Sequence, residues 1–173
     1  ALQQAFYALK EAAKAESVMI GFEQLSRSVG INGKEMIGTI QQITKGQISL
    51  AATAENTANA VSGGLGQDQI ADLATIAAKA STVLGRDLTD AYTRLVRGVG
   101  KIEPELLDEL GIFTRIQPAV DAYAAKIGKA ASQLTTLERK QAFANAVIEE
   151  GTLKYGGVSA SSDSALTSLN RFT

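Results

Sequence analysis

The chain of 173 residues contains no cysteine, no histidine and no tryptophan. Without cysteine there are no disulfide bonds and no thiolate zinc sites, and without histidine the commonest metal ligand and general base are missing. No run of about twenty apolar residues occurs, so the sequence predicts no transmembrane span. These absences lead us to expect no metal, no cofactor and no catalytic residue in this chain.

Neither sign of charge dominates, since 17 lysines and arginines stand against 18 aspartates and glutamates. The cationic residues are spread along the chain and form no evident patch that would hold a phosphate backbone. We therefore expect no specific nucleic-acid binding by this segment.

Helix-forming residues dominate the remaining composition. Alanine is abundant, there are only two prolines, and aromatic residues make up 5% of the chain. Strand-like alternation of β-branched residues is almost absent. The predicted fold class is therefore all-α, a compact multi-helix domain of short to medium amphipathic helices joined by Gly/Pro turns. We expect no helix longer than about thirty residues, because glycine or proline recurs at shorter intervals.

The stretch 67–112 has the clearest helical pattern. Its first apolar stripe is Ile70, Leu73, Ala77, Ala80 and Leu84, and its second is Leu88, Tyr92, Leu95 and Val99. Gly85 is expected to end the first helix and Asp87 to cap the second. Pro104 opens a third, short helix that ends at Gly111. The predicted shared core of these three helices consists of Leu73, Leu84, Leu95, Leu106 and Leu110.

The flanking segments show weaker versions of the same pattern. Before Gly30, stripes at Leu2, Phe6, Leu9 and Ala13 and at Val18, Phe22, Leu25 and Val29 predict one long helix or two joined at a bend. Helices are expected over 34–44, over 50–61 after the cap Ser49, from Pro118, and over 136–150 behind a Thr135–Glu138 capping box. We expect Gly151, Gly156 and Gly157 to form a loose link to a last helix that begins after residues 161–164.

The predicted organisation has three parts: an N-terminal helical part at 1–62, a central helical domain at 67–157, and the start of a further helix at 158–173. The chain begins in helical register without methionine and ends within an apparent helix. We interpret it as an internal segment of a longer protein, with processing or an engineered fragment as the alternative.

Residues 85–112, GRDLTDAYTRLVRGVGKIEPELLDELGI, resemble the tape measure (minor tail) proteins of long-tailed bacteriophages and prophages. The flanks 15–30, 43–69 and 126–156 are similar in style, so the resemblance covers most of the chain. It implies a non-enzymatic structural and assembly role in the virion, in which the segment helps determine tail length and occupies the tail tube or tip before DNA ejection. The implied location is the phage tail lumen or tip, and the bacterial host cytoplasm during assembly.

The resemblance also implies partners. These are the tail tube, tip or distal tail proteins, the tail assembly chaperone, and further copies of the chain in a homo-oligomer. The main alternative is a helical interaction or scaffold module of a bacterium, unrelated to phage, and a weaker one is a cell-wall-degrading enzyme domain. A very long parent gene beside tail genes favours the phage role, whereas a short stand-alone gene favours the scaffold.

Candidate catalytic groups have simpler structural interpretations. Glu103, Glu105, Asp108 and Glu109 lie close together, but on one short helix they point outward around its axis, whereas a glycosidase needs two carboxyl groups facing each other. Acids at a helix start are also favoured by the helix dipole alone. Ser49, Ser62 and Ser81 have no histidine to activate them, and GGLGQDQ lacks the lysine–hydroxyl pair of a phosphate loop.

Three arginines of the central stretch, Arg86, Arg94 and Arg97, allow two interpretations. Arginine makes directed, two-pronged bonds to carboxylates, and Asp87, Asp90 and Glu103 are close enough in sequence to accept them. The alternative is contact with another tail protein or another copy of the chain. We prefer the internal role.

Overall fold

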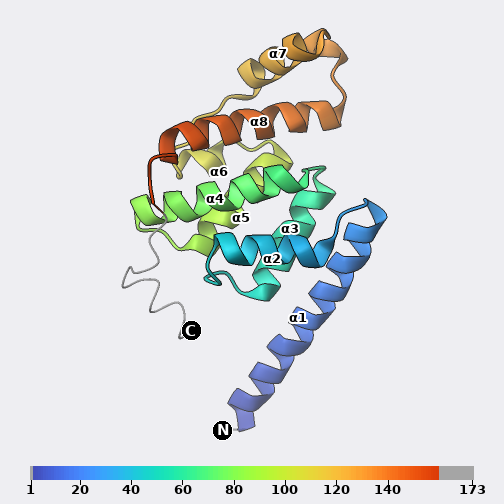
Figure 1. Cartoon of the computed structure of the whole chain (residues 1–173), viewed down its shortest axis with the longest axis vertical. Helices are drawn as coiled ribbons and strands as arrows, with labels where there is room; N and C mark the ends of the chain where they lie inside the picture. Colours follow the sequence, from blue (N-terminus) through green and yellow to red (C-terminus); the bar gives the residue numbers. More distant parts are fainter. Residues whose placement is uncertain (1, 160–173) are drawn as a thin grey trace.

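The computed structural model describes residues 2–159, and this part of the chain is wholly helical, with turns between helices (Figure 1). No strand occurs within it, which confirms the all-α fold class. The predicted last helix lies outside the described residues. The helices are α1 (Leu2–Ser28), α2 (Gly33–Ile43), α3 (Leu50–Ser62), α4 (Gln67–Leu84), α5 (Leu88–Lys101), α6 (Glu105–Asp108), α7 (Ile116–Ile127), the 3-10 helix η1 (Ala131–Gln133) and α8 (Thr136–Tyr155).

Helix starts follow the capping residues of the sequence. The Ser49 hydroxyl accepts from the Ala52 amide at 3.2 Å, and the Asp87 carboxylate accepts from the Asp90 amide at 2.8 Å. Thr135 and Glu138 form the predicted reciprocal box. These bonds satisfy amides that have no partner in the first turn of a helix, which is why the predicted starts of α3, α5 and α8 are confirmed.

The helices stack around one main core. In Figure 1, α1, α2 and α3 lie below α4 and α5, and α8 covers α4 on the other side with α7 outermost. One cluster of buried side chains runs from Phe22 in α1 to Tyr155 at the end of α8, and it contains residues from both sides of the predicted boundary at 62–67. A smaller cluster formed by Val120, Ala124, Leu134 and Ala142 holds α7 and η1 against α8.

The predicted central core is correct at three of its five leucines. Leu73, Leu95 and Leu110 are fully buried. Leu84 is 42% exposed because it belongs to the last turn of α4, directly before the left-handed Gly85, whose φ is 62°. Leu106 is only half-buried. Its neighbour Leu107 enters the core instead, because α6 is a single turn whose orientation a stripe pattern does not determine.

The chain up to Gly30 forms the single helix α1, but its first predicted stripe is not a packing face. Phe22 is buried in the main core, whereas Phe6 and Leu9 are 66% and 71% exposed. Val29, the last residue of the second stripe, is also mostly exposed. The helix packs against α3 and α2 only through its second half, and its first half extends away from the other helices (Figure 1).

Helix α8 is longer than predicted and continues through Gly151 to Tyr155. The predicted loose link at Gly151 is therefore wrong. Gly151 is buried against Ile76 of α4, and a Cβ added there would lie 2.9 Å from the Ile76 side chain. Gly151 therefore lets α8 and α4 approach closely and does not end the helix. The sequence alone does not distinguish these two roles of glycine.

Candidate functional site

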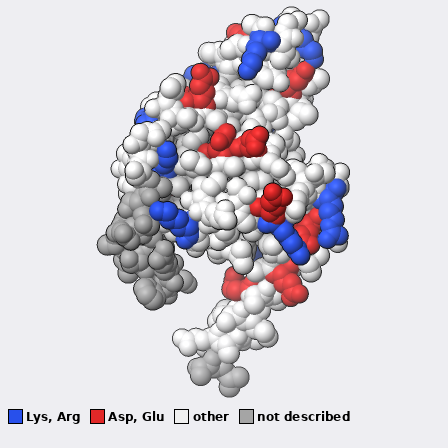
Figure 2. Space-filling view, in the orientation of Figure 1, with Lys and Arg blue, Asp and Glu red and all other residues white. Residues whose placement is uncertain are grey.

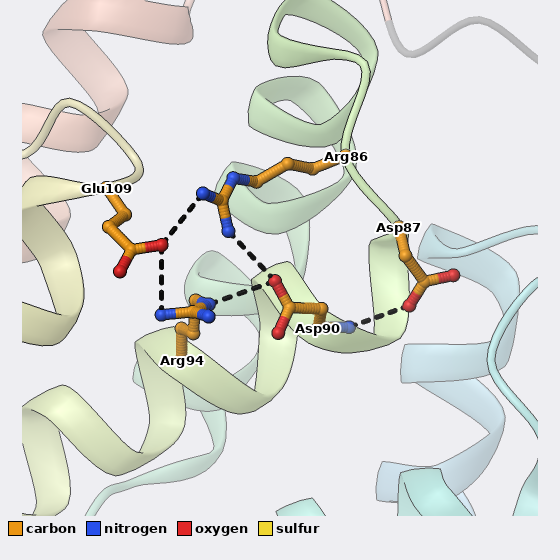
Figure 3. A network of polar contacts seen from close by, with 5 residues as sticks. All are labelled: Arg86, Asp87, Asp90, Arg94 and Glu109. Carbon is orange, nitrogen blue, oxygen red and sulfur yellow. Dashed lines mark hydrogen bonds and ion pairs between the residues drawn. The ribbon is translucent and has the colours of Figure 1, made fainter.

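Two arginines and two carboxylates form a closed ring where α4, α5 and α6 meet (Figure 3). Asp90 Oδ2 accepts from Arg86 Nη1 at 3.1 Å and from Arg94 Nε at 2.9 Å. Glu109 Oε2 accepts from Arg86 Nη2 at 2.8 Å and lies 3.2 Å from Arg94 Nη1. Each charged group thus contacts both groups of opposite sign, and the ring has no net charge.

The preferred internal role of the arginines is confirmed for Arg86 and Arg94, with one of the three proposed partners, Asp90. Their second partner is Glu109, which the sequence pattern missed in favour of Glu103. The hydrogen bond that Arg86 donates to the Glu109 carboxylate is the largest cause that raises the pKa of Arg86 above its ordinary value. The four side chains are 27–51% exposed, so water and salt screen the ion pairs and each pair contributes little to stability.

The acidic cluster considered for catalysis is divided between structural contacts. Asp108 pairs with Arg115 at 3.1 Å, and Glu109 belongs to the arginine ring. Glu105 is exposed and Glu103 half-buried. Within residues 2–159, no group of three or more acidic side chains is placed to hold a metal ion.

The end of α8 holds the backbone of residues 110–114. The Glu150 carboxylate accepts from the Phe113 amide at 2.7 Å and from the Thr114 hydroxyl at 2.6 Å. Lys154 Nζ donates to the Gly111 carbonyl oxygen at 2.6 Å, and the buried Tyr155 hydroxyl donates to that of Leu110 at 2.5 Å. We call these contacts and the arginine ring together the central network. It fixes α6 and the following loop between α5 and α8.

A groove of about 540 Å³ lies between α3 and α5. Its lining residues from α3 and the turn after it are Ala52, Glu55, Asn56, Asn59 and Gly63, and those from α5 are Thr89, Thr93, Val96, Arg97, Gly100 and Lys101. We call it the α3–α5 groove. Among these residues, the sequence pattern indicated a contact role only for Arg97, because nothing local in the sequence shows that two helices leave a space between them.

The first half of α1 forms the most exposed helical surface. Residues 3–14 are all exposed, and we call them the α1 arm. Phe6, Tyr7 and Leu9 are each more than 60% exposed on it. The visible face of its end carries no charged side chain (Figure 2), in agreement with the uncharged sequence from Gln3 to Leu9.

Charges of both signs are interspersed on the rest of the face in Figure 2. Among the helices of residues 2–159, none has the length and apolar character required to cross a membrane.

No protein-family model and no solved structure matches this chain.

Proposed function

We propose that this chain is a docking segment of a phage tape measure protein, a structural and assembly component that binds other tail proteins. Its partners are the tube, the tip or distal tail proteins, the assembly chaperone and further copies of the chain. It helps determine tail length from within the tail lumen or tip, after assembly in the bacterial cytoplasm. The sequence resemblance of residues 85–112 supports the family, and the α1 arm supports the docking role.

The α1 arm is the observation that carries the proposal. Large apolar side chains that are exposed together mark interaction surfaces in folded proteins. Phe6 and Leu9 form such a group on a helical segment that extends away from the other described helices, and the exposed Tyr7 lies on another side of the segment. An isolated helix shorter than about 12–15 residues is marginal in water, so a partner that covers the arm would also stabilise its helical form.

The exposed apolar side of α1 is distinct from the side that packs into the core. At about 100° per residue, Phe6, Leu9 and Ile20 lie on one side of the helix and Val18 and Phe22 on the opposite side. The second side packs into the core, whereas Ile20 is 53% exposed like the residues of the arm. A partner can therefore lie along the outer side of α1 without disturbing the core.

Helix length favours docking over measuring. A ruler gains ~1.5 Å per helical residue, so α1, the longest described helix at 27 residues, spans only about 40 Å. Every other described helix is shorter, and the helices fold back on one another. We infer that length is measured by other parts of the parent protein and that this segment binds at a defined position in the tail.

The test is genetic and uses the phage or prophage that encodes the chain. The double variant Phe6→Glu/Leu9→Glu places charge on the α1 arm, and Gln3→Glu/Lys10→Gln is the control on the same helix. We expect the first variant to abolish complete tails in electron micrographs, or to give tails of abnormal length, and the control to assemble normally. Normal tails from both variants would contradict the docking role.

A second measurement separates the phage role from the bacterial scaffold. Purified virions that contain the parent protein, detected by mass spectrometry, are expected under the tail proposal. Its absence from virions, together with its presence in uninfected cells that carry no prophage, would support the scaffold instead.

A further inference from the structure

The α3–α5 groove has a charge distribution that the fold does not explain. Arg97 and Lys101 lie one turn apart on its α5 wall and form no ion pair with any residue in the described part of the chain. Earlier on α5, Arg94 is held between two carboxylates. One helix thus carries an arginine that is neutralised internally and, one turn further on, two cations that remain available to a ligand.

Helix α5 contains two glycines, Gly98 and Gly100, and only Gly100 lines the groove. Glycine inside a helix costs about 1 kcal/mol of stability relative to alanine, so we ask what each glycine contributes. Gly98 allows close packing of α5 against α6, because an added Cβ would lie 2.6 Å from Leu107 Cδ2. Gly100 lines the groove, and an added Cβ there would meet nothing within 4 Å. The packing of this chain therefore explains Gly98 but not Gly100.

The remaining lining can bind a peptide backbone. Asn56 joins the two walls by donating to Thr93 Oγ1 at 3.1 Å and to the Ala52 carbonyl oxygen at 3.0 Å. Asn59 and Thr89 make no side-chain hydrogen bond within residues 2–159, so an amide and a hydroxyl are left for a ligand. Val96 and Ala52 add a small apolar surface.

We propose that the α3–α5 groove binds an acidic peptide segment of a partner protein. A carboxylate of that segment pairs with Arg97 and Lys101, its backbone bonds to Asn59 and Thr89, and a small apolar side chain covers Val96. A peptide fits better than nucleic acid, because it can place a carboxylate at Arg97 and Lys101 and an uncharged residue beside Glu55, whereas a phosphate backbone carries a negative charge at every nucleotide. The inference concerns a surface separate from the α1 arm and holds whether or not the arm docks.

The experiment measures fluorescence anisotropy of a labelled peptide of about twelve residues that carries two glutamates and an alanine near its middle. Three variants of the whole chain are compared with the unmodified protein. Gly100→Leu fills the groove, Arg97→Glu/Lys101→Glu reverses its charge, and Lys126→Glu/Lys140→Glu makes the same change of net charge on α7 and α8. We expect the first two to weaken binding about tenfold or more and the third to leave it within about twofold.

Folding of each variant is checked by circular dichroism and thermal unfolding. Gly100→Ala is the milder companion to Gly100→Leu, since one methyl group leaves most of the groove open, and it should bind nearly as well as the unmodified chain.

Three results would overturn the inference: an equal loss of affinity in the Lys126/Lys140 variant, tighter binding of the same peptide with lysines in place of its glutamates, or equal binding of a single-stranded oligonucleotide of similar length. Self-association of the chain that Gly100→Leu abolishes would identify a second copy as the occupant and would also overturn it.

Discussion

The central network and the α1 arm use their side chains in opposite ways. In the network, charged groups far apart in sequence neutralise one another, and α8 binds backbone groups of residues 110–114. In the arm, residues 3–14 are all exposed, and three large apolar side chains are among them. The stretch with the clearest family resemblance is thus the one that the fold uses internally. Arg86, Arg94 and Glu109 of this stretch maintain the structure, whereas Arg97 and Lys101 of the same stretch line the α3–α5 groove.

The largest expected difference is in how much stability is lost when a large apolar side chain is shortened in the core or in the α1 arm. Leu95→Ala should lower the free energy of unfolding by ~2–5 kcal/mol, because Leu95 is fully buried between helices of the core. Phe6→Ala should change it by less than about 0.5 kcal/mol, because the ring is mostly exposed. Urea unfolding of both variants measures the contrast. Equal losses would show that the arm packs in solution and would break the comparison.

The next largest effect concerns Tyr92, whose side chain is fully buried and whose hydroxyl has no hydrogen-bond partner within residues 2–159. Burial raises its pKa to about 12, and the nearby Thr57 hydroxyl lowers it only in part. Thr57 itself donates to the Thr53 carbonyl oxygen at 2.6 Å. The region around α5 therefore holds a tyrosine that stays neutral in the folded chain at a pH where an exposed tyrosine ionises.

Because the unfolded chain loses this proton near pH 10 and the folded chain near pH 12, stability from Tyr92 is present below pH ~10 and lost as pH rises above it. The loss should reach roughly 2–3 kcal/mol at pH ~12. Tyr92→Phe should have similar or higher stability at neutral pH and a shallower decline in urea unfolding between pH ~10 and ~12. Parallel declines in the two proteins would contradict the assignment.

A smaller effect is expected at the bonds between α8 and the loop. Glu150→Ala removes the acceptor of the Phe113 amide and the Thr114 hydroxyl and should cost ~1–3 kcal/mol. Glu11→Ala on the α1 arm is the matched control, because it removes the same charge from a fully exposed position. Urea unfolding should separate the two variants, and hydrogen exchange should show faster exchange of the Phe113 amide only in the first. A protected Phe113 amide in Glu150→Ala would be inconsistent with this contact.

The smallest expected effect is in the arginine ring. Glu109→Gln should cost ~0.5–1 kcal/mol at low ionic strength and less in ~1 M salt, where exposed charges are screened. Lys14→Gln on the α1 arm should show neither the loss nor its salt dependence. A salt-independent loss at Glu109 would mean that the side chain contributes through packing rather than charge.

The sequence predicted those features that depend on a few neighbouring residues. The caps Ser49, Asp87 and Thr135 and the stop at Gly85 each act within one helical turn, so local pattern was sufficient. The buried stripe of α5 was also predicted, because α3, α4, α6 and α8 all pack against this helix and its apolar face is fully used.

Features that depend on distant partners were missed. A stripe shows which side of a helix is apolar but not whether another helix covers it, so the pattern at Phe6 and Leu9 predicted a helix without showing that both residues are exposed. Glu109 reaches the arginines only because α6 turns back, a geometry that its spacing from Arg86 does not encode. The α3–α5 groove arises from the separation of two helix axes and leaves no local signal beyond Gly100.

The order of helix contacts has a consequence for how the chain folds during synthesis. Packing partners among α1 to α6 are neighbours one or two helices apart, such as α1 with α3 and α4 with α5. Such short-range topology favours fast folding, so these helices can associate as they leave the ribosome. Helix α8 is the exception, since Gln69 of α4 bonds to Gln141 and Asn145 across more than seventy residues. We therefore expect closure of α8 over α4 to be the last step, and the central network becomes complete at that step.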